Sequence, residues 1–145
     1  MPKVAYPFFK FPLPATDPYP QGQVICRPWV AATLTAQNGE SLRCYVCLDT
    51  GADACLFPLV LAIALKLDVL ALPRAMTGGV GSSTNVTYYA NVIVDIGNGI
   101  SFSAYAGFTE AMNAQGIGLL GQNDFFSTYD VAFCQKQGAF VIDVP

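Results

Sequence analysis

The chain of 145 residues contains no histidine. Catalysis by a Ser–His or Cys–His pair is therefore excluded, and the common zinc sites lose their imidazole ligand. Basic residues are also scarce, because only seven lysines and arginines are scattered along the chain and the net charge is −3. A nucleic-acid surface needs a basic patch, so we expect no nucleic-acid partner. We expect no metal and no cofactor either.

Long hydrophobic runs are missing as well, although the mean hydropathy is high at +0.43. The longest apolar run, residues 55–65, lies between Asp53 and Lys66 and is shorter than the ~20 residues that span a bilayer. Prolines interrupt residues 1–7 before any signal-peptide apolar core begins. Together with an odd number of cysteines, five, this predicts free thiols in a reducing compartment, the cytoplasm. We expect one domain without a membrane span, whose apolar contact surfaces suit an oligomer.

Residues 1–22 carry six prolines with aromatic residues between them, so this stretch is predicted to be an extended or irregular N-terminal arm. The arm can be a strap across the body, a contact to a second subunit or an inhibitory segment, and we favour the strap. Residues 23–145 are predicted to form the main domain. Cys44 and Cys47 make a C-x-x-C pattern on a predicted strand, where residues three apart face opposite sides and cannot bind one metal.

Alternating apolar and polar residues predict a mainly β chain. Strands are expected at residues 24–37 and 41–48 around the turn Asn38-Gly39, and at 86–96 and 100–106 around Gly97-Asn98-Gly99. A further hairpin is expected at 131–134 and 139–142. Residues 58–67 suit a helix that is apolar nearly all round and therefore largely buried. Asn123 or Asp124 is expected to cap a brief helix through Phe126.

The stretch of residues 47–53, Cys-Leu-Asp-Thr-Gly-Ala-Asp, ends a predicted buried strand in a carboxylate. A carboxylate that is held in place and shielded can activate water as a general base. Thr50 adds a hydroxyl that both donates and accepts, and Gly51 lets the backbone turn close to Asp49. The same three residue types are also common in ordinary turns after a strand. A second acid-x-Gly stretch at residues 95–97 lacks the hydroxyl and belongs to a tight hairpin turn.

Two later stretches follow in a recognisable order: the glycine-rich residues 77–83, Thr-Gly-Gly-Val-Gly-Ser-Ser, and residues 118–121, Gly-Leu-Leu-Gly. With the acid-Thr-Gly stretch, they make residues 24–144 similar to the retropepsin-like aspartic proteases, including single-domain bacterial members. The glycine-rich stretch resembles the flap of that family. Leu119-Leu120-Gly121 resembles the apolar pair and glycine that cross behind its catalytic loop.

The resemblance implies a single-lobe, closed β-barrel with one or two short helices. It implies an aspartic endopeptidase that cleaves between apolar residues with water activated by an aspartate pair. The chain supplies one Asp-Thr-Gly, so the active site implies a homodimer with one Asp49 from each copy. The implied catalytic residues are Asp49, Thr50 and Gly51. The implied substrate-binding residues are Ala52, Asp53, Gly78, Gly79, Val80, Gly81 and Leu119.

One position departs from the family pattern. Many members carry an arginine after the Leu-Leu-Gly glycine, paired with the acid that corresponds to Asp53, and this chain has Gln122 there. Two other interpretations therefore stay open. The chain can be a binding or dimerisation module that kept the fold without the chemistry, or a purely structural dimeric barrel.

Overall fold

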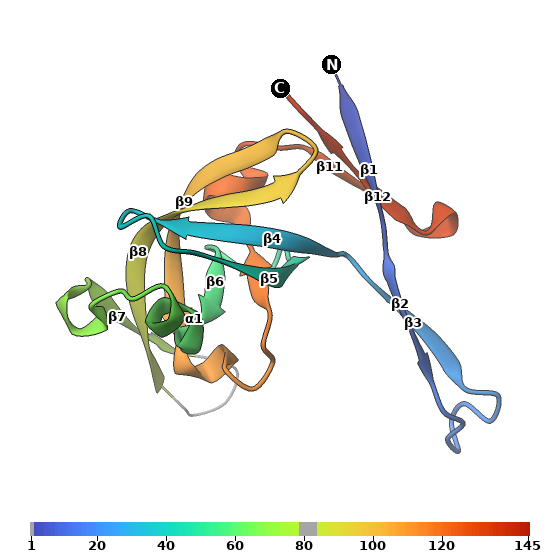
Figure 1. Ribbon diagram of the computed structural model, residues 1–145. Helices are drawn as coiled ribbons and strands as arrows, with labels where there is room; N and C mark the ends of the chain where they lie inside the picture. Colours follow the sequence, from blue (N-terminus) through green and yellow to red (C-terminus); the bar gives the residue numbers. More distant parts are fainter. Residues whose placement is uncertain (1, 79–83) are drawn as a thin grey trace.

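A computed structural model describes residues 2–78 and 84–145 of the chain, which form three β-sheets (Figure 1). The strands of the largest sheet are β4 (Trp29–Ala36), β5 (Ser41–Leu48), β6 (Leu56–Pro58), β7 (Arg74–Gly78), β8 (Thr84–Gly97), β9 (Ile100–Thr109) and β10 (Gly118–Leu120). The other two sheets contain β1 (Lys3–Pro7), β11 (Val131–Cys134) and β12 (Ala139–Asp143), and β2 (Phe9–Leu13) and β3 (Gln23–Arg27). The helical segments are α1 (Leu59–Ala64), η1 (Val69–Ala71), η2 (Glu110–Met112), η3 (Gln122–Phe126) and η4 (Gln135–Gln137).

The largest sheet closes on itself as a barrel of six strands. Its order is β4-β5-β10-β6-β9-β8, and β4 also pairs with β8, so no edge is left between the first and last of them. β7 is added outside this ring, on β8. The inner side chains of β4, β8 and β9 alternate with half-buried or exposed ones and fill the core, as period-two patterns require. The mainly β barrel predicted from the sequence is therefore confirmed.

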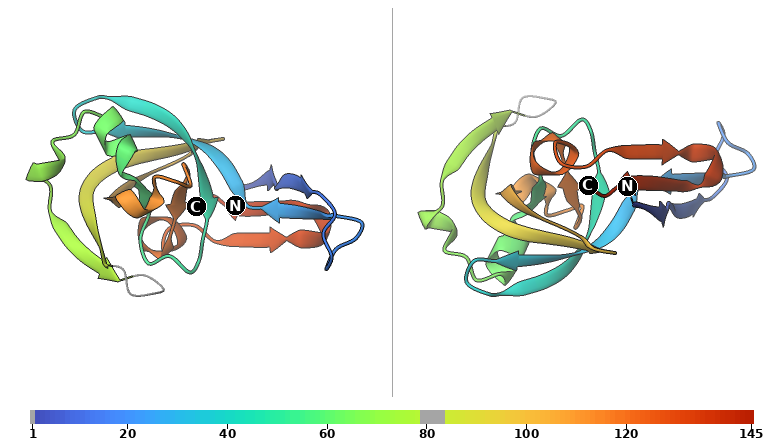
Figure 2. Two further views of the ribbon diagram at one scale, coloured as in Figure 1. Left: turned by 90° about the horizontal axis from the view of Figure 1, so that it is seen from below. Right: turned by 90° about the horizontal axis from the view of Figure 1, so that it is seen from above.

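The two smaller sheets lie beside the barrel and project from it (Figures 1 and 2). We call β1, β2, β3, β11 and β12 together the arm, which is larger than the N-terminal arm predicted over residues 1–22. β1 pairs along its whole length with β12, so the two chain ends run together. Pro28 separates β3 from β4, so the single strand expected over residues 24–37 is two strands. β2 pairs with β3 and points away from the barrel instead of crossing it as a strap.

The turns that the sequence predicted are present where they were expected. Gly97, Asn98 and Gly99 all have positive φ angles, of 81°, 55° and 81°, and join β8 to β9. Asn98 tolerates this conformation better than most residues, and glycine adopts it freely. The turn at Asn38-Gly39 joins β4 to β5, and the terminal hairpin joins β11 to β12.

Two local predictions are wrong. The buried helix predicted over residues 58–67 is shorter than expected, because only α1 is α-helical there. One side of α1 faces solvent, with Val60 48 % and Ile63 62 % exposed. The helix covers the barrel from outside, so only the side carrying Ala62 is enclosed. Asn123 and Asp124 cap no helix. Asp124 has a φ of 72°, and its carboxylate accepts a hydrogen bond from the Tyr105 N–H on β9, at 2.9 Å.

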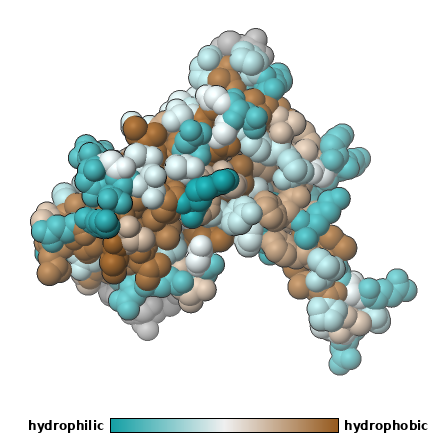
Figure 3. Space-filling view, viewed as in Figure 1, coloured by the Kyte–Doolittle hydropathy of each residue, from teal (hydrophilic) through white to brown (hydrophobic). Residues whose placement is uncertain are grey.

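Apolar and polar surface alternate over the face of the molecule in Figure 3, which is hollowed between the barrel and the arm. Among the residues that the structure describes, no helix combines the length and the hydropathy needed to cross a membrane.

Candidate active site

Asp49 follows directly on β5, at the point where this strand leaves the barrel core. Val46 and Leu48 are buried inside the barrel, because β5 alternates inner and outer residues. β10 runs parallel to β5, with Leu120 opposite Leu48. The Asp49 N–H donates to the Leu120 carbonyl at 3.0 Å, which extends the ladder by one bond and fixes where the acid emerges. The acid is therefore mounted on two paired strands.

The loop after Asp49 folds back on the carboxylate. The Gly51 N–H donates to Asp49 Oδ1 at 2.9 Å, and the Ala52 N–H donates to the Asp49 carbonyl at 3.2 Å. A Cβ at Gly51 would lie 3.2 Å from the same Oδ1, so a side chain there would crowd the carboxylate. Asp49 is partly buried, whereas Thr50 and Gly51 are exposed. The loop thus presents the acid on the surface of a single copy.

The segment after β10 holds the loop from behind. The Gln122 N–H donates to the Ala52 carbonyl at 2.8 Å, and its side-chain Nε2 donates to the Thr50 carbonyl at 2.9 Å. The Asn123 N–H donates to the Asp53 carbonyl at 2.9 Å. Sequence reasoning noted Gln122 only as a missing arginine and assigned Asn123 to a helix cap. The only feature of the sequence that could have indicated this bracing role is the amide side chain of Gln122, which can both donate and accept hydrogen bonds.

Asp53 is exposed, and the ion pairs recorded in the described part of the chain do not include it. They join Lys3 to Asp143 and Lys66 to Glu40. Uncharged hydrogen bonds from Gln122 and Asn123 therefore brace this loop where the family pattern has an arginine.

Gly121 lies where the two segments come closest. A Cβ there would overlap the carbonyl oxygen of Ala54 and would lie 2.6 Å from that of Ala52. Real Cβ atoms do not approach backbone oxygens so closely, so only glycine fits between them. The glycine of the Leu-Leu-Gly stretch is thus required for the close packing behind the Asp49 loop.

The other predicted site residues, and Leu120 beside them, differ in where they lie. Leu119 is half-buried on β10, paired with Cys47 and with Leu56, and so lies beside the Asp49 loop. Leu120 is fully buried and belongs to the core. The backbone of Gly78 pairs with Thr84 at the end of β7. The predicted positions Gly79, Val80 and Gly81 lie outside the described residues.

Cys47 and Trp29 lie next to the acid on the outer side of the barrel. Burial raises the pKa of the Cys47 thiol, and the nearby charge of Asp49 raises it further. A side-chain hydrogen bond from Trp29 and the charge of Arg27 act in the opposite direction. Trp29 pairs with Cys47 in the β4–β5 register. These four side chains therefore share one local environment at the end of β5.

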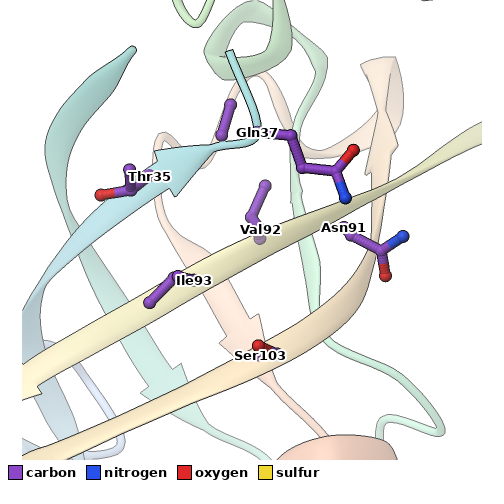
Figure 4. A pocket seen from close by; sticks show the side chains of 7 residues that line it. Thr35, Gln37, Asn91, Val92, Ile93 and Ser103 are labelled. Atoms are coloured by element: carbon purple, nitrogen blue, oxygen red, sulfur yellow. The ribbon is translucent and has the colours of Figure 1, made fainter. Parts of the chain in front are cut away.

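A cavity elsewhere on the barrel, of about 160 Å³, is unrelated to this acid (Figure 4). It lies over β4, β8 and β9, and the polar side chains of Thr35, Gln37, Asn91 and Ser103 are on its rim. None of the residues predicted for the active site contributes to its lining.

No protein-family model matches the sequence, and no curated protein matches it. Among solved structures, the fold is similar to a retropepsin-like aspartic protease from Rickettsia conorii, with a TM-score of 0.58 over 99 % of this chain and 96 % of the other. The two sequences are 13 % identical, so the likeness shows the fold alone. With its closed six-stranded barrel, the chain has the retropepsin-like fold.

Proposed function

We propose that this protein is an aspartic endopeptidase that cleaves between apolar residues, with one Asp49 from each copy of a homodimer. The observation that carries the proposal is the way in which paired strands and the following loop hold the Asp49 carboxylate. The acid stands at the end of paired strands, accepts from the Gly51 N–H and lies on the surface of one copy. A second copy placed on a twofold axis at this loop brings the two carboxylates face to face.

Two carboxylates at close range cannot both ionise easily, so the pair shares a proton, as aspartic proteases do in general. The ionised carboxylate takes a proton from a bound water, and the water oxygen attacks the peptide carbonyl carbon. The protonated partner donates to the carbonyl oxygen as it becomes an oxyanion. A proton then passes to the leaving nitrogen, the C–N bond breaks, and a new acid and a new amine are released.

The neighbouring residues have supporting roles in this proposal. Thr50 links the two loops across the twofold axis, and Gly51, Ala52 and Asp53 hold the substrate backbone. Leu119 lines an apolar subsite. We propose that the predicted flap residues Gly78, Gly79, Val80 and Gly81, of which the last three lie outside the described residues, close over the substrate and exclude water. We place the enzyme in the cytoplasm, where its cysteines stay free; all five are unpaired in the described structure.

A second candidate is a peptide-binding or dimerisation module with the same fold and no chemistry. The bracing of the loop by Gln122, without a charged partner for Asp53 among the described residues, favours this candidate. This candidate does not explain why hydrogen bonds hold the Asp49 carboxylate in place, because a binding module does not need this acid.

The deciding experiment compares wild type with Asp49→Asn on a mixed peptide library between about pH 3 and pH 7. We expect cleavage between apolar residues by wild type, with an acidic optimum. The variant should fold alike and lose activity, because its amide cannot take a proton from water. Circular dichroism serves as the control for folding. Activity near the wild-type level in Asp49→Asn contradicts the proposal, whereas peptide binding without cleavage by wild type supports the binding module.

A further inference from the structure

The arm carries an apolar groove that the proposed chemistry does not use. The groove is a shallow, open hollow of about 250 Å³, and its lining consists of Phe11, Leu13, Ile25, Arg27 and Trp29. We call it the arm groove.

Strand register explains why these residues gather on one side of the arm. In the β2–β3 pair, Phe11 lies opposite Ile25, and successive side chains of a strand alternate between faces. The odd-numbered residues of both strands therefore share one face. Lys10 and Val24 lie on the other, and Val24 is 64 % exposed. A ribbon of two strands is marginally stable in water without something to pack against, so a partly exposed apolar face on it favours a partner.

The arm groove is continuous with the surface that carries Asp49. The Trp29 ring packs against Phe11 at a centroid distance of 5.0 Å and pairs through the backbone with Cys47. Cys47 lies two residues before Asp49, and the charge of Asp49 raises the pKa of its thiol. Phe9 packs against both Trp29 and Tyr45 of β5, at 5.9 and 5.2 Å, and so fixes the arm to the barrel at this point. Aromatic and apolar side chains thus lead from the acid out along the arm.

Arg27 gives the arm groove a polar end. Its guanidinium donates to the Cys26 carbonyl at 3.2 Å, and no ion pair of Arg27 is recorded in the described part of the chain. An exposed guanidinium beside an apolar groove suits a ligand that carries both an apolar side chain and a carboxylate.

We propose that the arm groove is a distal substrate subsite, which binds an apolar side chain of an extended polypeptide beyond the bond cleaved at Asp49, with Arg27 binding an acidic neighbour. The inference rests on the proposed function and names the substrates it selects. Trp29 lies opposite Cys47 in the antiparallel β4–β5 pair, so Ile25 lies about two strand residues, or roughly 7 Å along the strand direction, beyond the level of Asp49. An extended substrate spans this distance with a similar number of residues. β2 and β3 pair only with each other in the described structure, so their outer edges can also accept a peptide strand.

The single tryptophan of the chain allows binding to be measured without catalysis. Trp29 lines the arm groove, so its fluorescence reports on occupancy. We would titrate Asp49→Asn with a long peptide that carries an apolar and an acidic residue about two to three positions from the expected cleavage site. A matched peptide would carry serines there. A saturable change in fluorescence with the first peptide only is the expected result. Equal responses to both peptides overturn the inference.

Cleavage kinetics test the same subsite in the active protein. The preference for long over short peptides, measured as a ratio of kcat/KM, should fall about tenfold in Ile25→Asp, through KM. Val24→Asp on the opposite face should keep the wild-type ratio. Arg27→Glu should remove the preference for an acidic residue, while Lys10→Glu retains it. Leu13→Ser replaces Ile25→Asp if that variant folds poorly. An unchanged ratio in the groove variants contradicts the proposal.

Two outcomes distinguish a substrate subsite from a dimer contact and from a binding module without chemistry. If Trp29 fluorescence changes with protein concentration in the absence of peptide, and Ile25→Asp converts dimer to monomer, a second copy fills the arm groove and the proposal is wrong. If the long peptide changes fluorescence but wild type cleaves nothing, the arm groove is a peptide-binding site and the proposed peptidase activity is wrong.

Discussion

At the scale of single residues, the Asp49 site depends on backbone groups more than on side chains. The carboxylate accepts from one N–H of its own loop, and three further donors on Gln122 and Asn123 hold that loop in place. Backbone donors keep their positions without side-chain entropy cost, so the acid stays fixed even on an exposed loop.

Gly121→Ala should therefore damage activity and stability together. The new methyl group meets the carbonyl oxygens of Ala52 and Ala54, and the Asp49 loop must move. Overpacking of this kind costs about 1–3 kcal/mol of unfolding free energy. We expect that loss in urea denaturation, with a fall in kcat of at least about tenfold, because small displacements of a catalytic group are costly.

Gly39→Ala is the matched control for this variant. Gly39 has a φ of 87° and nothing within 4 Å of its would-be Cβ, so alanine there strains the backbone without touching the site. It should cost about 1 kcal/mol and leave kcat unchanged. Normal activity in Gly121→Ala would contradict the packing that we describe behind the Asp49 loop.

The sequence predicted the acid and the glycine of this site but not what supports the loop. Asp49 and Gly121 stand in short local patterns, and their roles follow from a strand end and a close approach. The contacts of Gln122 with Thr50 and Ala52 join positions about 70 residues apart, and no local pattern encodes them. Asp124 was misread for the same reason, because its partner Tyr105 lies on another strand.

At the scale of elements, α1 is anchored by a few buried residues near its C-terminal end. Leu65 is fully buried after the last turn, and its carbonyl accepts from the Asn38 side chain at 2.9 Å. Ile63 is apolar as well but is 62 % exposed. When every position of a helix is apolar, no polar stripe marks the side that faces water, so the sequence cannot show which side is covered.

Leu65→Ala and Ile63→Ala should therefore differ in their effects on stability. The first leaves a cavity and should lower the unfolding free energy by about 2–5 kcal/mol. The second removes a side chain that is mostly in water and should change it by no more than about 0.5 kcal/mol. Urea denaturation of the two variants measures the difference directly. Equal losses would mean that Ile63 is covered in solution, for example by a second copy.

Hairpins were the most predictable elements, and the pairing of the N-terminal strands within the arm was the least. A hairpin is specified by its turn residues and by alternation on either side, as in residues 86–106. The arm depends on β1 pairing with β12, which joins Lys3 to Asp143 across nearly the whole chain. Prolines in residues 1–22 correctly indicated an extended chain, but they do not identify its strand partners.

At the scale of the whole molecule, the half-buried thiol of Cys44 and the buried thiol of Cys55 should make folding sensitive to alkaline pH. Burial raises the pKa of Cys44 and of Cys55 from 9.0 to about 11. Above pH 9.0 the unfolded chain loses these protons while the folded chain keeps them, so stability falls until the pH reaches about 11 and then levels off. Urea denaturation at several pH values measures the slope.

The variant Cys55→Ala provides the comparison for this pH dependence. It removes one of the three thiols whose pKa is raised, so its stability should fall less steeply over the same pH range than that of wild type. Cys134→Ala, at a partly exposed position on β11, serves as the matched substitution and should leave the slope unchanged. A wild-type slope in Cys55→Ala would show that its thiol does not cause the effect.

An active site shared between two copies makes one further prediction about the assembled molecule. A mixed dimer of wild type and Asp49→Asn holds only one functional carboxylate, so it should be inactive. With wild type held constant, an equal amount of the variant should lower activity to about half, and a threefold excess to about a quarter, if the copies exchange freely. Gly39→Ala, added instead, should cause no such loss. Unchanged activity on adding Asp49→Asn, with exchange confirmed by mass spectrometry of tagged copies, would mean that one chain holds a complete site.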